Sequence, residues 1–316
     1  MSIRKASSDD RDLLLRRLEG TINEQQQFLE QIKAIVGPAD LKQFGAIAVS
    51  ACARLRVDAR AMLSAEEHQA LELVLRLMRP APLVNDGALP GLPLEGGSRA
   101  FPAWDGFRAA VAPRLRSIGR LDRAAGNEHS GTGFLVAPNL VLTNEHVLAD
   151  LGYGTHYLAD GQAVIRFKLE QDADGAYESH PIRRVRSVHP SADLALLEID
   201  PIGSPVVEFA AEPAQAGESI VVVGFPAAGT GRNPYFVPLL FQNIFGLKRA
   251  APGVLLQTDL SQLWHDASTL GGNSGSPVFS IASGQVVGVH NAGQFMWRNY
   301  AVPAAIASAF VQAHQG

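Results

Sequence analysis

From about Ile118 onward, the apolar residues fall into short runs separated by turns, and this pattern restricts the possible folds more than any other feature. The runs cover residues 133–136, 140–143, 163–167, 194–199, 219–223, 254–258, 277–279 and 285–289. Short apolar runs with glycine and proline between them are typical of an all-β sandwich or barrel. About 200 residues of this kind would suit two small barrels, and we therefore predict an all-β domain over residues 107–316.

The first quarter of the chain has a different pattern. Apolar residues recur at a spacing of three to four over residues 8–79, which is typical of amphipathic helices. The pair Ser64 and Glu67 matches a capping box, in which a serine and a glutamate three residues later begin a helix. We therefore predict a small all-α helical bundle over residues 1–79.

Between these regions lies a segment rich in proline and glycine. It contains five prolines, at positions 80, 82, 90, 93 and 102, and its glycines include positions 87, 91, 96 and 97. These residues disfavour a helix or a central strand, so residues 80–106 are predicted to be a linker.

Composition excludes several classes of protein. The net charge of −4 disfavours a nucleic-acid surface, and no apolar run is long enough to span a membrane. Cys52 is the only cysteine, which excludes an internal disulfide framework and a multi-thiolate zinc site. The amino terminus lacks the apolar core of a secretory signal, so a cytoplasmic location is expected. A secreted bacterial protein whose leader is missing from this sequence is the alternative.

The stretch STLGGNSGSPVF, residues 268–279, carries the strongest chemical signal. A serine is a poor nucleophile until a base removes its proton, and the attacked carbonyl needs N–H donors for its negative charge. Glycines let a loop place such donors close to a substrate. This stretch is therefore either an ordinary turn or a nucleophile loop, in which Ser274 attacks and the N–H groups of Gly272 and Ser274 form an oxyanion hole.

A nucleophilic serine requires a base and an acid that orients the base. Among the nine histidines, His146 is the best candidate because it directly follows an apolar strand-like run. Asp193 is the best acid because it stands in a polar turn that opens another such run, where a carboxylate can be buried against an imidazole.

Five blocks in order resemble the chymotrypsin/trypsin-like serine peptidases: residues 131–136, 143–147, 193–197, 272–277 and 288–293. The branch typified by V8 glutamyl endopeptidase is the most similar. The resemblance implies a chymotrypsin-like all-β double barrel with six antiparallel strands in each barrel. It also implies a catalytic triad in which Asp193 orients His146, and His146 acts as general base toward Ser274 and then as general acid. Neither a cofactor nor a metal is expected.

The same resemblance places three residues in the primary specificity pocket. Ser268 would lie at its floor, where an aspartate would favour Lys or Arg, so preference for basic residues is not expected. Thr269 and His290 match positions that bind a glutamate side chain in V8-type enzymes. Cleavage after acidic residues is one expectation, and a packed His290 with an apolar or small pocket is the other.

The helical region weakly resembles small adaptor domains, of effector-associated or death-like type, that are fused to trypsin-like peptidases in bacterial defence proteins. That likeness implies a protein partner bearing a similar domain, while the alternative is a structural or oligomerisation bundle. The leading hypothesis is a serine endopeptidase that acts on proteins or peptides, binds no nucleic acid or membrane, and is targeted by its helical domain. The rival is a latent peptidase fold that serves as a protein-binding module.

Overall fold

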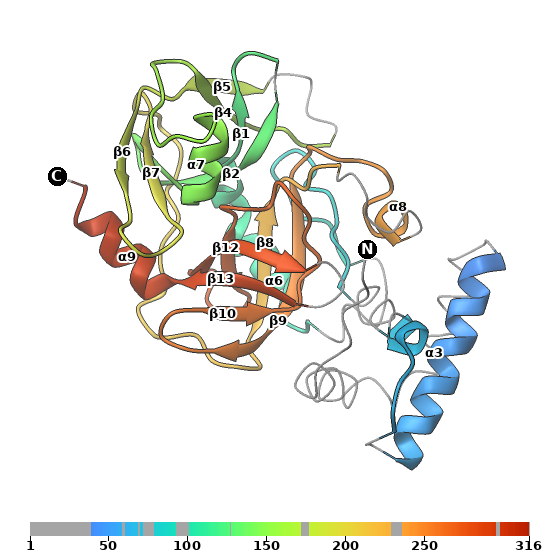
Figure 1. Cartoon of the computed structure of the whole chain (residues 1–316). Helices are drawn as coiled ribbons and strands as arrows, with labels where there is room; N and C mark the ends of the chain where they lie inside the picture. Colours follow the sequence, from blue (N-terminus) through green and yellow to red (C-terminus); the bar gives the residue numbers. More distant parts are fainter. Residues whose placement is uncertain are drawn as a thin grey trace. The chain divides into compact units, whose positions relative to one another are not determined.

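The computed structural model describes nine segments of the chain: residues 39–58, 61–68, 70–71, 79–92, 101–126, 128–171, 177–228, 236–294 and 298–315. The chain divides into two compact units, Met1–Met78 and Arg79–Gly316 (Figure 1). None of the described helices is both long enough and apolar enough to cross a membrane.

The described part of the first unit is helical. Helix α3 covers Ala39–Val57 and buries Ala51, Cys52 and Leu55, which confirms a helix within the region 8–79 that was predicted to be helical. The capping box is also confirmed, because the Ser64 N–H donates to Glu67 Oε2 at 2.8 Å and the Glu67 N–H donates to Ser64 Oγ at 3.1 Å. The helical runs predicted for residues 8–36 lie outside the described residues, so the complete bundle stays a prediction.

The second unit contains two antiparallel sheets. The first is a seven-stranded sheet with the order β5-β4-β1-β2-β3-β7-β6, one strand more than the resemblance implied. Its strands are β1 (Ile118–Arg123), β2 (His129–Ala137), β3 (Leu140–Thr143), β4 (Ala163–Phe167), β5 (Glu178–Pro181), β6 (Arg184–Val188) and β7 (Ala195–Glu198).

The second sheet is a closed six-stranded barrel with the order β10-β13-β12-β11-β8-β9. Its strands are β8 (Ser219–Gly224), β9 (Arg249–Thr258), β10 (Leu263–His265), β11 (Pro277–Ser280), β12 (Val286–Gln294) and β13 (Arg298–Pro303). The helices of this unit are α6 (Trp104–Val111), α7 (Glu145–Leu151), α8 (Phe236–Phe241), the terminal α9 (Ala304–Gln312) and the 3-10 helix η1 (Ala112–Ser117) (Figure 1).

In the first sheet, β3 and the second half of β2 are apolar on both faces because each face fills a different core. Along β3, Val141 belongs to the core inside the first sheet, whereas Leu140 and Leu142 belong to a larger core shared with the second barrel. On β2, Leu135 belongs to the core inside the first sheet and Phe134 belongs to the larger core. Successive strand residues face opposite sides, so two cores require continuous apolar runs.

Residues 80–106, which were predicted to be a linker, are in their described parts packed against the second unit's core. Val84, Leu89, Phe101 and Trp104 are buried in the larger core. Leu83 forms an isolated bridge with Arg249 on β9. The prolines suppress regular secondary structure, but they do not prevent packing, since an irregular chain can bury its apolar side chains once its backbone groups find partners. The predicted domain start at residue 107 falls inside helix α6.

Candidate active site

His146 is placed by the junction between β3 and α7. Strand β3 ends at Thr143, Asn144 is the extended residue that precedes the helix, and His146 is the second residue of α7. Val147, Leu148 and Leu151 fix the helix because they are buried in the core of the first sheet. The imidazole of His146 faces outward, and its side chain is 46% exposed.

Asp193 is brought to His146 by strand pairing. Thr143 on β3 lies opposite Ala195 on β7, so the residues just beyond these two strand ends are neighbours. Asp193 Oδ2 lies 2.8 Å from His146 Nδ1, and Asp193 Oδ1 accepts the His146 backbone N–H at 3.0 Å. The Asn144 side chain donates to the Asp193 carbonyl at 2.8 Å, which fixes the turn further. The carboxylate therefore holds both the ring and the backbone of His146.

The environment of Asp193 favours its charged form. Burial raises the pKa of the carboxyl, but hydrogen bonds from the ring and backbone of His146, together with the Glu145 N–H, outweigh burial and leave the pKa below its usual value. A charged Asp193 next to Nδ1 favours the tautomer in which Nδ1 carries the proton and Nε2 is free to accept one.

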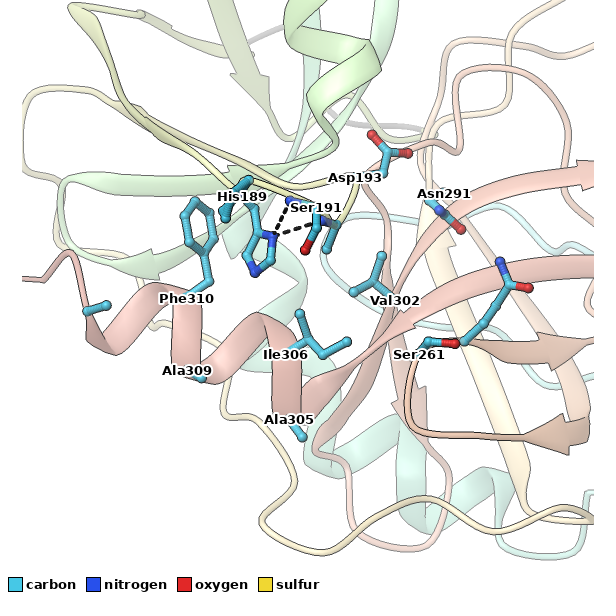
Figure 2. Close-up of a pocket in the computed structure, with 14 residues that line it drawn as sticks. His189, Ser191, Asp193, Ser261, Asn291, Val302, Ala305, Ile306, Ala309 and Phe310 are labelled. Atoms are coloured by element: carbon cyan, nitrogen blue, oxygen red, sulfur yellow. Dashed lines mark hydrogen bonds between the residues drawn. The ribbon is translucent and has the colours of Figure 1, made fainter.

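A second histidine shapes the turn that carries Asp193. His189 Nδ1 accepts the N–H groups of Ser191 at 3.2 Å and Ala192 at 2.8 Å (Figure 2). An accepting Nδ1 requires a neutral ring, so His189 acts as a cap for this turn. Sequence reasoning missed this role, because the signal is only a histidine two residues before a serine in a polar turn.

Ser274 lies on the loop before β11, between two glycines with left-handed backbone. Gly272 and Gly275 both have φ of +86°, a conformation that other residues rarely adopt. A Cβ on Gly275 would lie 2.0 Å from the Thr132 carbonyl oxygen, and one on Gly272 would lie 2.4 Å from the Phe225 carbonyl oxygen. Both positions therefore require glycine for conformation and for space.

The peptides around Ser274 are oriented so that two N–H groups are available. The Gly271 carbonyl accepts the Ala227 N–H at 2.7 Å, and the Asn273 carbonyl accepts the Ser276 N–H at 2.9 Å. In a planar trans peptide the N–H points opposite to the carbonyl, so the N–H groups of Gly272 and Ser274 point away from these anchors. Neither N–H has an acceptor among the described residues. This arrangement can bind an oxyanion.

Gly131 on β2 lies close to both the helix that carries His146 and the Ser274 loop. A Cβ at Gly131 would be 2.7 Å from Val147 Cγ2, next to His146, and 3.1 Å from the Ser274 carbonyl oxygen. No hydrogen bond joins the Ser274 hydroxyl to His146 among the described residues. Such bonds are often long before substrate binds, and rotation about the Cα–Cβ bond of the serine moves its hydroxyl.

The three residues predicted to line the specificity pocket are buried. The Ser268 hydroxyl donates to the Arg79 carbonyl at 2.7 Å, and Thr269 is 4% exposed. His290 lies with its Nδ1 3.1 Å from Nε2 of His265, and its ring also hydrogen-bonds the backbone of Tyr300. Burial, with a smaller effect from His146, lowers the pKa of His290 to about 3, so this ring is neutral at physiological pH.

Arg79, the first residue of the second unit, contacts the residues around His290, and the sequence did not indicate this. The Arg79 guanidinium pairs with Asp266 at 3.1 Å, beside His265. The described residues contain no group of three or more His, Cys, Asp or Glu side chains that could hold a metal ion.

A pocket of about 1000 Å³ adjoins the Asp193 turn, and neither His146 nor Ser274 lines it. One wall is helix α9, with Ile306 and Phe310, and another is the turn that carries His189 and Ser191 (Figure 2). The Asp193 carboxylate points away from Ile306 (Figure 2). The pocket thus lies beside the His146–Asp193 pair rather than around it.

Comparison with known proteins shows the family of this chain. The trypsin-like peptidase domain model matches residues 131–289, just over half of the 316-residue chain. A serine protease of Mycobacterium tuberculosis is 30% identical over 186 residues, covering 57% of this chain and 40% of that protein. A probable serine protease of Lysobacter enzymogenes is 28% identical over 290 residues, covering 72% of this chain and 73% of that protein.

A glutamyl endopeptidase of Staphylococcus epidermidis is 27% identical over 178 residues, covering 53% of this chain and 56% of that protein. The solved active form of the M. tuberculosis protease matches with a TM-score of 0.47 and 22% identity, covering 74% of this chain and 92% of that one. The match to the M. tuberculosis sequence spans less than half of that relative's length. The family match includes the His146, Asp193 and Ser274 segments, and the chain belongs to the trypsin-like peptidase family.

Proposed function

We propose that this protein is a serine endopeptidase with Ser274 as nucleophile, His146 as general base and acid, and Asp193 as the group that orients His146. The N–H groups of Gly272 and Ser274 form the oxyanion hole. The observation that carries the proposal is the 2.8 Å contact between His146 Nδ1 and Asp193 Oδ2, on a chain that belongs to the trypsin-like peptidase family.

The chemistry follows from these positions. His146 Nε2 takes the proton of Ser274 Oγ as Oγ bonds to the scissile carbonyl carbon, and the carbonyl oxygen becomes an anion bound by the two N–H groups. The protonated imidazole, stabilised by Asp193, then gives its proton to the leaving amine as the C–N bond breaks. Water then loses a proton to His146 as its oxygen bonds to the acyl carbon. The bond between that carbon and Ser274 Oγ breaks, His146 returns the proton to Oγ, and the acid product leaves.

The rival function is a latent scaffold that only binds proteins, and it predicts a collapsed oxyanion loop. The anchored carbonyls of Gly271 and Asn273 argue for the enzyme, because they already direct the N–H groups of Gly272 and Ser274 away from the protein backbone. Preorganised donors of this kind provide much of the rate acceleration in acyl transfer.

A fluorophosphonate probe tests the proposal, because only an activated serine reacts with it. We expect the full chain to be labelled at Ser274, and Ser274→Ala to lose both labelling and peptidase activity, the latter by about 10⁶-fold. Ser280→Ala, on β11, is the matched control and should keep both. Labelling that persists in Ser274→Ala would show that another residue is the nucleophile. A wild type that is not labelled but binds protein ligands would favour the scaffold function.

We further propose that the primary pocket accepts small or apolar residues rather than glutamate. A carboxylate needs donors or a positive charge, but His290 is neutral and its ring already has partners in His265 and the Tyr300 backbone. The Ser268 hydroxyl is committed to the Arg79 carbonyl. The Arg79 guanidinium, whose backbone carbonyl accepts the Ser268 hydroxyl, is paired with Asp266.

Cleavage-site profiling on a denatured proteome distinguishes the two preferences. We expect small or apolar residues before the cut, with Lys and Arg absent. Enrichment of Glu before the cut would refute the apolar assignment and return His290 and Thr269 to a carboxylate-binding role.

We also propose that the first unit binds a protein partner with a similar helical domain. Val57 and Met62 support this, because they are 91% and 78% exposed on a small unit. Sedimentation of the full chain should show self-association that Val57→Asp weakens. A monomer unaffected by the substitution would exclude binding between copies of this chain. A cytoplasmic location and a role in bacterial defence stay predictions.

A further inference from the structure

Thr132 is the residue through which the first sheet holds the Ser274 loop. It lies on β2 and is fully buried, with 0% exposure. Its N–H donates to the Ser274 carbonyl at 2.8 Å, and its hydroxyl donates to the Gly272 carbonyl at 2.7 Å. The hydroxyl also accepts the Phe225 N–H at 3.2 Å. One residue therefore holds two carbonyls of the loop, one between the two oxyanion donors and one after them.

We propose that Thr132 is a positioning residue that sets the geometry of Ser274 and of the oxyanion hole. The proposal rests on the proposed function, since it assigns Thr132 a role in the same reaction. Thr132 itself touches neither substrate nor the reacting atoms. It acts by fixing the carbonyls of Gly272 and Ser274, and hence the peptide planes next to the two N–H donors.

The loop needs this restraint because glycine makes it flexible. Gly272 and Gly275, which flank the nucleophile, can adopt many backbone conformations. Only contacts from outside the loop can select the one that aims both donors at the same point. The Gly271 carbonyl is held by Ala227, just beyond β8, and the Asn273 carbonyl is held by Ser276 of the loop itself. Thr132 therefore supplies the restraint from the first sheet.

A threonine suits this task for two reasons. A hydroxyl donates one hydrogen bond and accepts others at the same time, which the Gly272 carbonyl and the Phe225 N–H together require. The branched Cβ limits rotation of the side chain, so the hydroxyl stays aimed at Gly272. Valine has almost the same shape but offers neither bond.

Thr132 is also linked to the segment that carries His146. The Thr143 hydroxyl donates to the Thr132 carbonyl at 2.7 Å, and Thr143 is the last residue of β3, three positions before His146. Gly275 lies against the same carbonyl, because a Cβ there would be 2.0 Å from the Thr132 oxygen. Hydrogen bonds from Thr143 to Thr132 and from Thr132 to Gly272 thus link the segment that carries His146 to the loop that carries Ser274.

The test is a substitution series at Thr132 in the full chain. We expect Thr132→Val to lower kcat by about 10- to 100-fold with KM changed less than threefold, since the misaligned donors act mainly in the transition state. Thr132→Ser should keep kcat within about threefold. Thr155→Val is the matched control: its hydroxyl also donates to a backbone carbonyl, Gly152 at 2.9 Å, but away from Ser274, and kcat should not change.

Binding of a peptidyl boronic acid separates positioning from a purely structural role. Its affinity should fall in Thr132→Val by the same factor as kcat, while a product peptide binds as in the wild type. If Thr132→Val fails to fold, Thr132→Cys, with its weak thiol donor, should give an intermediate kcat.

A folded Thr132→Val or Thr132→Cys enzyme with wild-type kcat and boronate affinity would overturn the proposal. Equal losses in Thr132→Ser and Thr132→Val would do the same. A wild type without fluorophosphonate labelling would instead refute the proposed function itself, so the two failures are distinguishable.

Discussion

Thr143 on β3 lies directly opposite Ala195 on β7, and this register position is the reason that His146 and Asp193 meet. At this end of the sheet β3 continues into α7, and β7 begins after the turn that His189 caps. A slip of one residue would turn the alternate side chains of β7 to the other core, so burial on both faces of the sheet enforces the register.

Asp193→Asn should therefore impair catalysis without disturbing the fold. An amide at this position can present its NH₂ to His146 Nδ1 and hold the ring in the wrong tautomer, and kcat should fall by about 10⁴-fold. The melting temperature should change little, and the loss should be smaller at high pH. Unchanged kcat across the pH range would mean that the contact between Asp193 and His146 has no catalytic role.

Gly275→Ala should prevent formation of the active loop. The alanine would have to adopt a φ of +86°, which is strained for a residue with a side chain, and its Cβ would lie 2.0 Å from the Thr132 carbonyl oxygen. Gly217→Ala is the matched control, because Gly217 has φ of +88° but no atom within 4 Å of an added Cβ. The control should lose about 1–2 kcal/mol of stability from backbone strain and stay active. Fluorophosphonate labelling of both variants measures the difference, and equal labelling would exclude a steric requirement at Gly275.

One buried histidine, His290, and one partly buried histidine, His129, should make the fold less stable in acid. Burial, with a smaller effect from His146, lowers the pKa of His290 to about 3, and burial, with Arg120, lowers that of His129 to about 4, against an ordinary value of 6.5. Between pH 6.5 and 4.5 the unfolded chain gains protons at these positions that the folded chain does not bind. The free energy of unfolding should therefore fall on acidification, by up to about 1.4 kcal/mol per pH unit for each group.

Denaturation in urea across this pH range, in a Ser274→Ala background that cannot digest itself, measures the effect. His290→Gln should remove about half of the histidine contribution to the slope. Parallel slopes for the two proteins would mean that His290 titrates normally and is not held neutral.

The buried ion pair between Lys248 and Glu170 should be costly to break. Lys248 Nζ lies 2.6 Å from Glu170 Oε1 and donates to the Leu115 carbonyl at 2.7 Å, with the two side chains 0% and 3% exposed. Lys248→Met leaves a buried carboxylate without its cation, and should destabilise the fold by about 3–5 kcal/mol. Adding Glu170→Gln should recover part of this loss.

Chemical denaturation measures both variants of the pair. Arg183→Met is the control, because Arg183 forms exposed ion pairs with Asp160 and Asp200, and stability should barely change. A Lys248→Met protein as stable as this control would show that the pair carries no stability.

Part of the fold could be predicted from periodicity. The runs at 140–143 and 163–167 coincide with β3 and β4. Strand β3 is recognisable because both of its faces are buried, and β4 because four of its five residues are apolar. Strand β5 was not predicted, since its residues Glu178–Pro181 are polar and lie at the sheet edge, where little apolar surface is buried. Strand β10 is only three residues long, too short for any period to emerge.

The sequence by itself pointed to His146, Asp193 and Ser274 as candidates, in that order. A base after a strand, an acid in a turn and a serine among glycines suit this chemistry, and the blocks that contain them resemble the trypsin-like peptidases. Only the tertiary structure decided what surrounds them. The roles of Thr132, His189 and Arg79 depend on contacts between residues distant in sequence or on the shape of one turn. Periodicity and spacing report on local conformation, whereas such contacts arise only when strands pair and cores pack.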